Sequence, residues 1–181
     1  MKRHELAGFA WAVATIGAMV AGCKSANDQQ MAAAPNPVIE VERPDAVENL
    51  TPDQREAQFV YSYETGLEMI RREQYAHAMG AFEEALRLNP TSTESMFNLA
   101  ACYDSIGDPL RAIQIYRRLL ELTPNDPDCH ANLGTAFIKM YYRERSPAWR
   151  KMAWQSWERS LRLNPEQPEI AKYLERSKNA E

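Results

Sequence analysis

The chain has 181 residues, of which 45% are hydrophobic and 25% are charged, a composition that suits one globular core. Glycine is scarce, with seven residues, while alanine, leucine, glutamate and arginine are frequent, so the composition predicts an all-α fold. The formal net charge of −4 argues against a nucleic-acid partner, because such proteins need a clustered basic surface to displace counterions from phosphate. We therefore expect no nucleic acid among its partners.

Residues 1–22 have the pattern of an export signal. Lys2 and Arg3 precede an apolar run from Leu6 to Val20 that contains no ionisable residue. A membrane-spanning helix needs about 20 apolar residues, so this run is short for one. The pattern instead favours a signal peptide that is removed from the mature chain.

The end of this run, Val20-Ala21-Gly22-Cys23, resembles the lipobox of bacterial lipoproteins. The resemblance implies lipidation of Cys23 by a diacylglyceryl thioether and usually an N-acyl chain such as palmitate, and several acyl chains anchor a protein stably. The alternative is an ordinary secretory signal in which Cys23 is incidental. Lys24 is not the Asp that resembles an inner-membrane retention signal, so we expect a periplasm-facing protein with the outer membrane favoured over the inner.

Residues 23–50 are predicted to form a flexible tether. From Lys24 to about Leu50 the sequence is polar, contains Pro35, Pro37 and Pro44, and has no sustained apolar period. A flexible coil of roughly 27 residues spans ~30 Å, which is enough to hold a domain clear of lipid headgroups. Helix should begin at Thr51-Pro52, because Thr caps a helix N-terminus and Pro suits its first position.

A repeat of 34 residues begins at about Phe59. The first copy has Ala78, Phe82, Leu88 and Pro90. The pattern recurs 34 residues later as Ala112, Tyr116, Leu122 and Pro124. It recurs again 41 residues after that as Ala153, Trp157, Leu163 and Pro165. Gly66, Ala100 and Gly134 are small residues at the same 34-residue spacing. The third copy therefore carries seven extra residues, about two helical turns, which we place between Met140 and Arg150.

Physical chemistry explains these positions as two antiparallel helices per repeat. Small residues let the two helices approach closely, and aromatic residues fill the space between repeats. Each hairpin leaves an apolar face that only its neighbour can bury, so about three repeats and a polar terminal helix are needed. The segment from Pro168 to about Ser177 supplies that helix, with Ile170, Tyr173 and Leu174 on one face.

The pattern resembles the tetratricopeptide repeat. Residues 93–126 match its signature best, at Leu99, Ala100, Tyr103, Gly107, Ala112, Tyr116 and Pro124. The resemblance implies an all-α, right-handed superhelix of hairpins in residues 51–92, 93–126 and 127–166, closed by a capping helix and tail in 167–181. The first unit departs from the family at Ser62 and Met69, where Trp and Tyr are common.

The extra residues of the third unit, 141–149, allow two interpretations. Ser146-Pro147 is typical of a helix start, as Asp108-Pro109 is in the second unit, so both helices of the third hairpin would be about one turn longer. The segment is also rich in Tyr and Arg. The sharper interpretation is a protruding basic and aromatic tip that contacts a partner or anionic headgroups.

The sequence offers no constellation for catalysis, so we predict that the protein is not an enzyme and needs no metal or cofactor. His77 has no ligand at helical spacing, and Cys129-His130 lacks the upstream cysteine of a haem attachment motif. Cys102 and Cys129 are expected to be small buried thiols, with a disulfide between neighbouring units as the alternative.

The resemblance places a partner-binding groove on the first helices of the three units. Carried over, its residues are Tyr63, Glu64, Leu67, Ile70, Phe97, Asn98, Ala101, Asp104, Ala131, Asn132, Thr135 and Lys139. Asn98 and Asn132 match groove asparagines whose amides donate to and accept from a partner's backbone. Tyr63 and Leu67 stand where a carboxylate clamp would have Lys and Asn, so the groove favours a hydrophobic segment or helix. Alternatively, Tyr63, Leu67 and Phe97 only pack against their neighbours.

These features predict a membrane-anchored scaffold of the bacterial cell envelope that binds a peptide or helix of other envelope proteins. It is broadly similar to tetratricopeptide lipoproteins that support pilus assembly or envelope enzymes. Two alternatives stay open: an accessory subunit of an envelope enzyme, and a structural spacer that self-associates through its end helices. The sequence does not name the partner or the oligomeric state.

Overall fold

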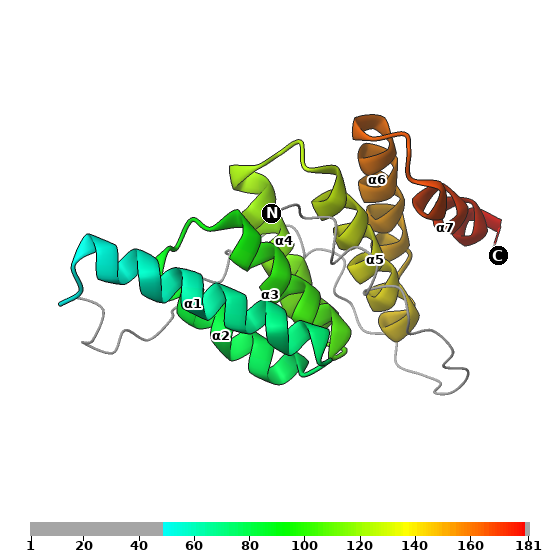
Figure 1. Ribbon diagram of the computed structural model, residues 1–181. Coiled ribbons are helices and arrows are strands. Elements are labelled where there is room, and N and C mark those ends of the chain that lie inside the picture. The colour runs from blue at the N-terminus through cyan, green and yellow to red at the C-terminus, as the bar shows by residue number, and fades with distance from the viewer. Residues whose placement is uncertain (1–48, 180–181) are drawn as a thin grey trace. The chain divides into compact units, whose positions relative to one another are not determined.

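The computed structural model describes residues 49–179. The predicted signal peptide, Cys23 and nearly all of the predicted tether lie outside these residues. Within them the chain forms seven helices and no strand, so the predicted all-α fold is confirmed. The helices, labelled in Figure 1, are α1 (Pro52–Arg71), α2 (Tyr75–Leu88), α3 (Thr93–Ser105), α4 (Pro109–Leu122), α5 (Pro127–Glu144), α6 (Pro147–Leu163) and α7 (Pro168–Asn179).

The helices pack as three successive hairpins and a terminal helix. The hairpins are α1 with α2, α3 with α4, and α5 with α6. The second helix of each hairpin packs on the next hairpin, so α2 contacts α3 and α4 contacts α5, while α7 packs on α6 (Figure 1). The first helices of neighbouring hairpins also meet, since α3 contacts α5. This is the stacked arrangement that the repeat predicted.

Polar caps and prolines fix where the helices begin. Thr51 forms a capping box: its hydroxyl accepts from the Gln54 N–H at 3.2 Å, and its own N–H donates to Gln54 Oε1 at 2.9 Å. The Asp108 and Asp126 carboxylates accept from backbone N–H groups in the first turns of α4 and α5, and each aspartate is followed by proline. Ser146 is the N-cap of α6, but its side chain makes no capping hydrogen bond.

Each turn inside a hairpin contains one residue in the left-handed conformation. These residues are Glu73 (φ 58°), Gly107 (φ 85°) and Arg145 (φ 58°). Only glycine adopts this conformation without strain, so the middle turn has the residue that the geometry favours. The other two turns place a charged residue there instead.

The interior is built where small residues face aromatic ones. A methyl group on Gly66 would lie 2.6 Å from the Phe82 ring, and one on Gly134 would lie 2.4 Å from Trp157. Phe82, Tyr116 and Trp157, the predicted space-filling aromatics, are all buried. The glycines therefore allow the first and second helices of a hairpin to approach as closely as the aromatic rings require.

The third hairpin is longer than the second. Helix α5 has 18 residues against 13 in α3, and α6 has 17 against 14 in α4. The extra residues thus lengthen both helices at the end where they join, by about one turn each.

Cys102 and Cys129 are both buried and are not joined in a disulfide. Burial raises the pKa of the Cys102 thiol to about 12, so this cysteine stays protonated at neutral pH. Both behave as small apolar core residues. No helix in the described part of the chain is long and apolar enough to cross a membrane.

Candidate functional site

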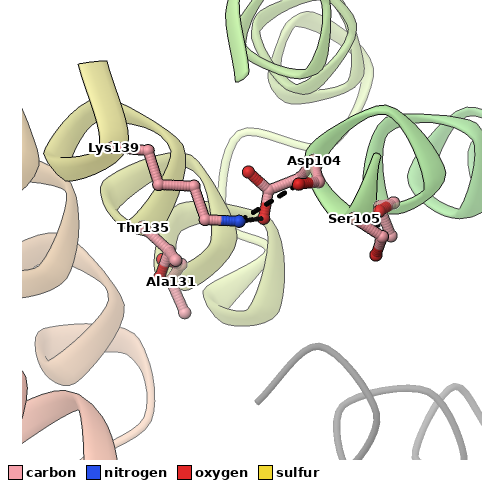
Figure 2. Close-up of polar contacts among 6 residues, drawn as sticks. Asp104, Ser105, Ala131, Thr135 and Lys139 are labelled. Atoms are coloured by element: carbon pink, nitrogen blue, oxygen red, sulfur yellow. Dashed lines mark hydrogen bonds and ion pairs between the residues drawn. The ribbon is translucent and has the colours of Figure 1, made fainter. Parts of the chain in front are cut away.

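The first helices of successive hairpins, α1, α3 and α5, are joined by polar contacts. The Asn98 amide on α3 donates to the Tyr63 hydroxyl on α1 at 3.3 Å. The Lys139 ammonium on α5 donates to the Asp104 carboxylate on α3 at 2.7 Å and to the Asp104 backbone carbonyl at 3.1 Å (Figure 2). In both contacts the partners lie 35 residues apart, so each links one repeat to the next.

The structure places the twelve predicted groove residues at three depths; we call these twelve residues the first-helix face. The buried members are Ile70, Phe97, Asn98, Asp104 and Ala131. The half-buried members are Tyr63, Leu67, Ala101, Asn132, Thr135 and Lys139. Glu64 is exposed. The half-buried members and Glu64 are therefore the part of this face that solvent reaches.

Two aromatic members of the face pack inward. The Phe97 ring is 6% exposed and lies edge-on to the buried Tyr116 ring of α4, with 5.9 Å between centroids. The Tyr63 ring lies edge-on to Phe82 at the same separation and stacks near Phe59. Phe97 therefore contributes to the core, whereas Tyr63 packs its ring and keeps its hydroxyl for Asn98.

Asp104 is a buried carboxylate with one partner side chain. Its side chain is 10% exposed, against 39% for Lys139, and no group of the described chain donates to its Oδ1 atom. Burial raises the pKa of Asp104 above its usual range, and the Lys139 ammonium opposes that shift only in part. At neutral pH the ionised carboxylate is thus held at a cost to stability.

A row of α5 side chains continues from this ion pair. Figure 2 shows Thr135 and Ala131 beside Lys139 on α5, with Asp104 and Ser105 across from them on α3. The Thr135 hydroxyl donates to the Ala131 carbonyl at 3.2 Å, and the Ser105 hydroxyl donates to the Ala101 carbonyl at 2.8 Å. Each hydroxyl proton is therefore donated to a backbone carbonyl of its own helix, and the hydroxyl oxygen remains available as an acceptor.

Asn132 and Tyr116 extend the polar part of the face into the core. Burial outweighs the effect of the Asn132 side chain, which lowers the pKa of the Tyr116 phenol. Burial raises the pKa of Tyr116 well above its usual value, and the negative charge of Asp104 adds to the rise, so the phenol stays protonated. Tyr116 was expected only to fill space between units.

Sequence reasoning named Asp104 and Lys139 separately but missed their pairing. Opposite charges 35 residues apart, one more than the repeat, were the available signal. The sequence also did not predict a stack of cations and aromatic rings across α5, α6 and α7. In this stack Arg150 lies over the Tyr141 and Trp154 rings, and Lys178 lies over the Trp154 ring. Within residues 49–179 no group of three His, Cys, Asp or Glu side chains could hold a metal ion.

Comparison with known proteins identifies the same repeat. A family model described as tetratricopeptide repeat matches residues 69–140. The photosystem I assembly protein Ycf3 of Synechococcus sp. (strain CC9605) is 36% identical over 117 residues, which cover 59% of this chain and 67% of the relative.

Two solved structures show the same fold. The TPR domain of OM64 from Arabidopsis aligns with a TM-score of 0.62 at 18% identity, over 69% of this chain and 98% of that domain. The second TPR domain of human RPAP3, solved in complex with an HSP70 peptide, aligns with a TM-score of 0.59 at 18% identity, over 68% of this chain and 98% of that domain.

Proposed function

Because the chain belongs to the tetratricopeptide repeat family, we propose that it is a non-catalytic scaffold that binds a segment of another protein on its first-helix face. The observation that carries the proposal is the set of half-buried side chains on this face, which alternate apolar atoms with hydrogen-bonding groups. Leu67 and Ala101 offer apolar contact, while Asn132, Thr135 and Lys139 offer donors and acceptors. An extended peptide or a helix needs both kinds of contact.

The chemistry of the face favours a partner segment with an apolar side over a free C-terminal carboxylate. Lys139, the one cation on this face, already donates twice to Asp104. Tyr63 and Leu67 occupy the positions where a carboxylate clamp would have Lys and Asn. The HSP70 peptide held by the human RPAP3 domain is therefore not the kind of ligand that we propose here.

The anchor is the second part of the proposal. The lipobox-like residues ending at Cys23 support a lipoprotein of a bacterial cell envelope, facing the periplasm and held in the outer rather than the inner membrane. Lipid on Cys23 and a tether up to residue 50 would keep the repeats close to the membrane surface. Other envelope proteins would then be the partners.

Photo-crosslinking tests the face. A crosslinking residue in place of Ala101 or Thr135, both half-buried, should capture a defined partner in intact cells. Ala76, exposed on the second helix α2, gives a matched control position. Mass spectrometry of the products identifies the partner. If Ala76 captures the same proteins in the same yield, the face is not the binding site.

Fractionation tests the anchor independently. Cys23→Ser removes the sulfur that would carry the diacylglyceryl group, so the variant should move from the membrane fraction to the soluble fraction, while Cys102→Ser should not change the distribution. Membrane retention of Cys23→Ser at high salt would rule out the lipid anchor and leave the binding face untouched.

A further inference from the structure

The end of the third hairpin concentrates positive charge in an otherwise acidic chain. We call residues 141–151, where α5 ends and α6 begins, the basic tip. It contains Arg143, Arg145, Arg150 and Lys151 and a single carboxylate, Glu144, giving a net charge of +3. The whole chain carries −4, so the remainder carries −7. The longer helices of this hairpin therefore end in a basic cluster.

Three of the four cations of the tip face solvent. Arg143, Arg145 and Lys151 are exposed, and neither Arg143 nor Lys151 forms an ion pair with another described residue. The Glu144 carboxylate instead accepts from the Trp149 indole N–H at 2.7 Å. That hydrogen bond holds the one acidic group of the tip against the hairpin.

An exposed aromatic ring accompanies these charges. Tyr142 is 56% exposed, among the few large hydrophobic side chains that the described residues leave in solvent. The Arg145 guanidinium lies over its ring, 5.8 Å from the centroid. Tyrosine with neighbouring Arg and Lys is the composition that favours the interface between water and lipid, because the ring settles among headgroups while cations meet phosphates.

A stack of cations and aromatic rings joins the base of the tip to the last helix. Arg150 lies 5.4 Å from the Tyr141 centroid and 5.1 Å from the Trp154 centroid, and Lys178 of α7 lies 6.0 Å from the Trp154 centroid. The Trp154 indole N–H donates to the Ser177 hydroxyl at 2.7 Å, which fixes α7 beside α6. The stack thus holds two cations, Arg150 of α6 and Lys178 of α7, against the Tyr141 and Trp154 rings.

We propose that the basic tip docks on the anionic lipid headgroups of a membrane. The choice of a membrane over an acidic protein rests on the proposed lipid anchor, which would confine the domain near headgroups. A second membrane contact of this kind would orient the hairpins relative to the surface. The −7 charge of the remaining chain disfavours a long polyanion such as a nucleic acid, which would extend beyond the tip.

Vesicle binding tests the basic tip in a protein that carries no lipid anchor on Cys23. The mature chain, residues 23–181 with Cys23→Ser, should bind vesicles containing phosphatidylglycerol at low salt, should release at high salt, and should not bind vesicles of phosphatidylcholine alone. Each Lys or Arg near an anionic surface strengthens binding about fivefold, so Arg143→Glu with Lys151→Glu should weaken it about thirtyfold or more.

Matched variants separate the tip from net charge and from misfolding. Arg162→Glu with Lys172→Glu makes the same change in formal charge on exposed positions outside the tip and should leave binding close to that of the parent. Arg143→Gln with Lys151→Gln should give a smaller loss in the same direction, and circular dichroism checks folding.

Three outcomes would overturn the proposal: no binding to anionic vesicles, equal loss in the control variant, or a tip that crosslinks to an acidic protein but ignores lipid. Fractionation of wild type against Cys23→Ser reports on the anchor separately.

Discussion

Asp104 is a buried acid that lowers the stability of the fold when it is ionised. Its carboxylate is buried, and among residues 49–179 no group donates to one of its oxygens and only the Lys139 ammonium compensates for its charge. Core positions usually exclude such groups, because an incompletely paired buried charge costs more than its Coulomb attraction returns. If the first-helix face binds a partner as we propose, Asp104 would be an acid kept for that face and not for the core.

The raised pKa of Asp104 sets the direction of its pH dependence. The reference pKa of the carboxyl is 3.8, and the pKa in the folded state is higher, so the folded state binds the proton more tightly than the unfolded state. Asp104 therefore lowers the free energy of unfolding as pH rises from 3.8 to the folded pKa. Asp104→Asn removes this loss. We expect the free energy of unfolding of the variant, relative to wild type, to increase between pH 4 and pH 7.

Urea unfolding of both proteins across this pH range measures the difference, in which the other carboxylates largely cancel. Lys139→Met is the companion variant: it removes the opposing charge and should lower stability at neutral pH more than at pH 4. The difference in the free energy of unfolding between Asp104→Asn and wild type could instead stay constant or fall as pH rises. Either result would show that burial does not raise the pKa of Asp104 as we expect.

The register of the first-helix face was predictable in outline because it follows the repeat. Leu67, Ala101, Asn132 and Thr135 lie half-buried, as residues able to meet a partner should. Phe97 is buried because Tyr116 of the paired helix covers its ring. A sequence shows which stripe of a helix faces inward but not how far neighbouring side chains cover the edge of that stripe. Burial of Phe97 and Asn98 therefore needed the structure.

At the scale of the element, the helices were predictable and the turns were not. The 34-residue period and the prolines after polar caps located the helix starts, because backbone hydrogen bonding and a fixed φ act locally. Nothing in the sequence around Glu73 or Arg145 signals a left-handed residue, which glycine or asparagine would have signalled. Hairpin closure is what these turns have in common, and each of them places one residue at positive φ.

Gly107 allows the backbone cost of that turn to be measured. A methyl group there would meet no atom within 4 Å, so the cost of Gly107→Ala is conformational and should lower the free energy of unfolding by about 1 kcal/mol. Gly80 also has open space but lies inside α2. Gly80→Ala should therefore raise stability by about 0.5 to 1 kcal/mol.

The same substitution should thus change the free energy of unfolding in opposite directions at two uncrowded glycines. Chemical denaturation of the two variants measures this difference. If Gly107→Ala is neutral, the turn relaxes to an ordinary conformation and hairpin closure does not impose the left-handed residue.

At the scale of the molecule, stability depends on neighbours in a line, because each hairpin contacts only the next. Helix α7 closes the end of that line on α6: Ile170 is buried, the Tyr173 ring stacks on Trp157 at 6.3 Å, and Ser177 accepts from Trp154. The helix also carries Lys178, whose ammonium lies over Trp154 and pairs with Glu158 at 2.8 Å. Closing the core and supporting the cation stack are thus tasks of one element.

A chain that ends after Gln167 lacks α7 and should lose about 2 to 4 kcal/mol, since one fully buried aliphatic side chain and one aromatic pair are removed. In a linear stack the loss should be local. Hydrogen exchange should therefore quicken in α5 and α6 far more than in α1 and α2, while Glu175→Ala, an exposed change on the same helix, should leave exchange unaltered. Equal loss of protection at both ends would mean that the hairpins unfold as one unit, and a partner bound anywhere on the face would then stabilise the whole stack.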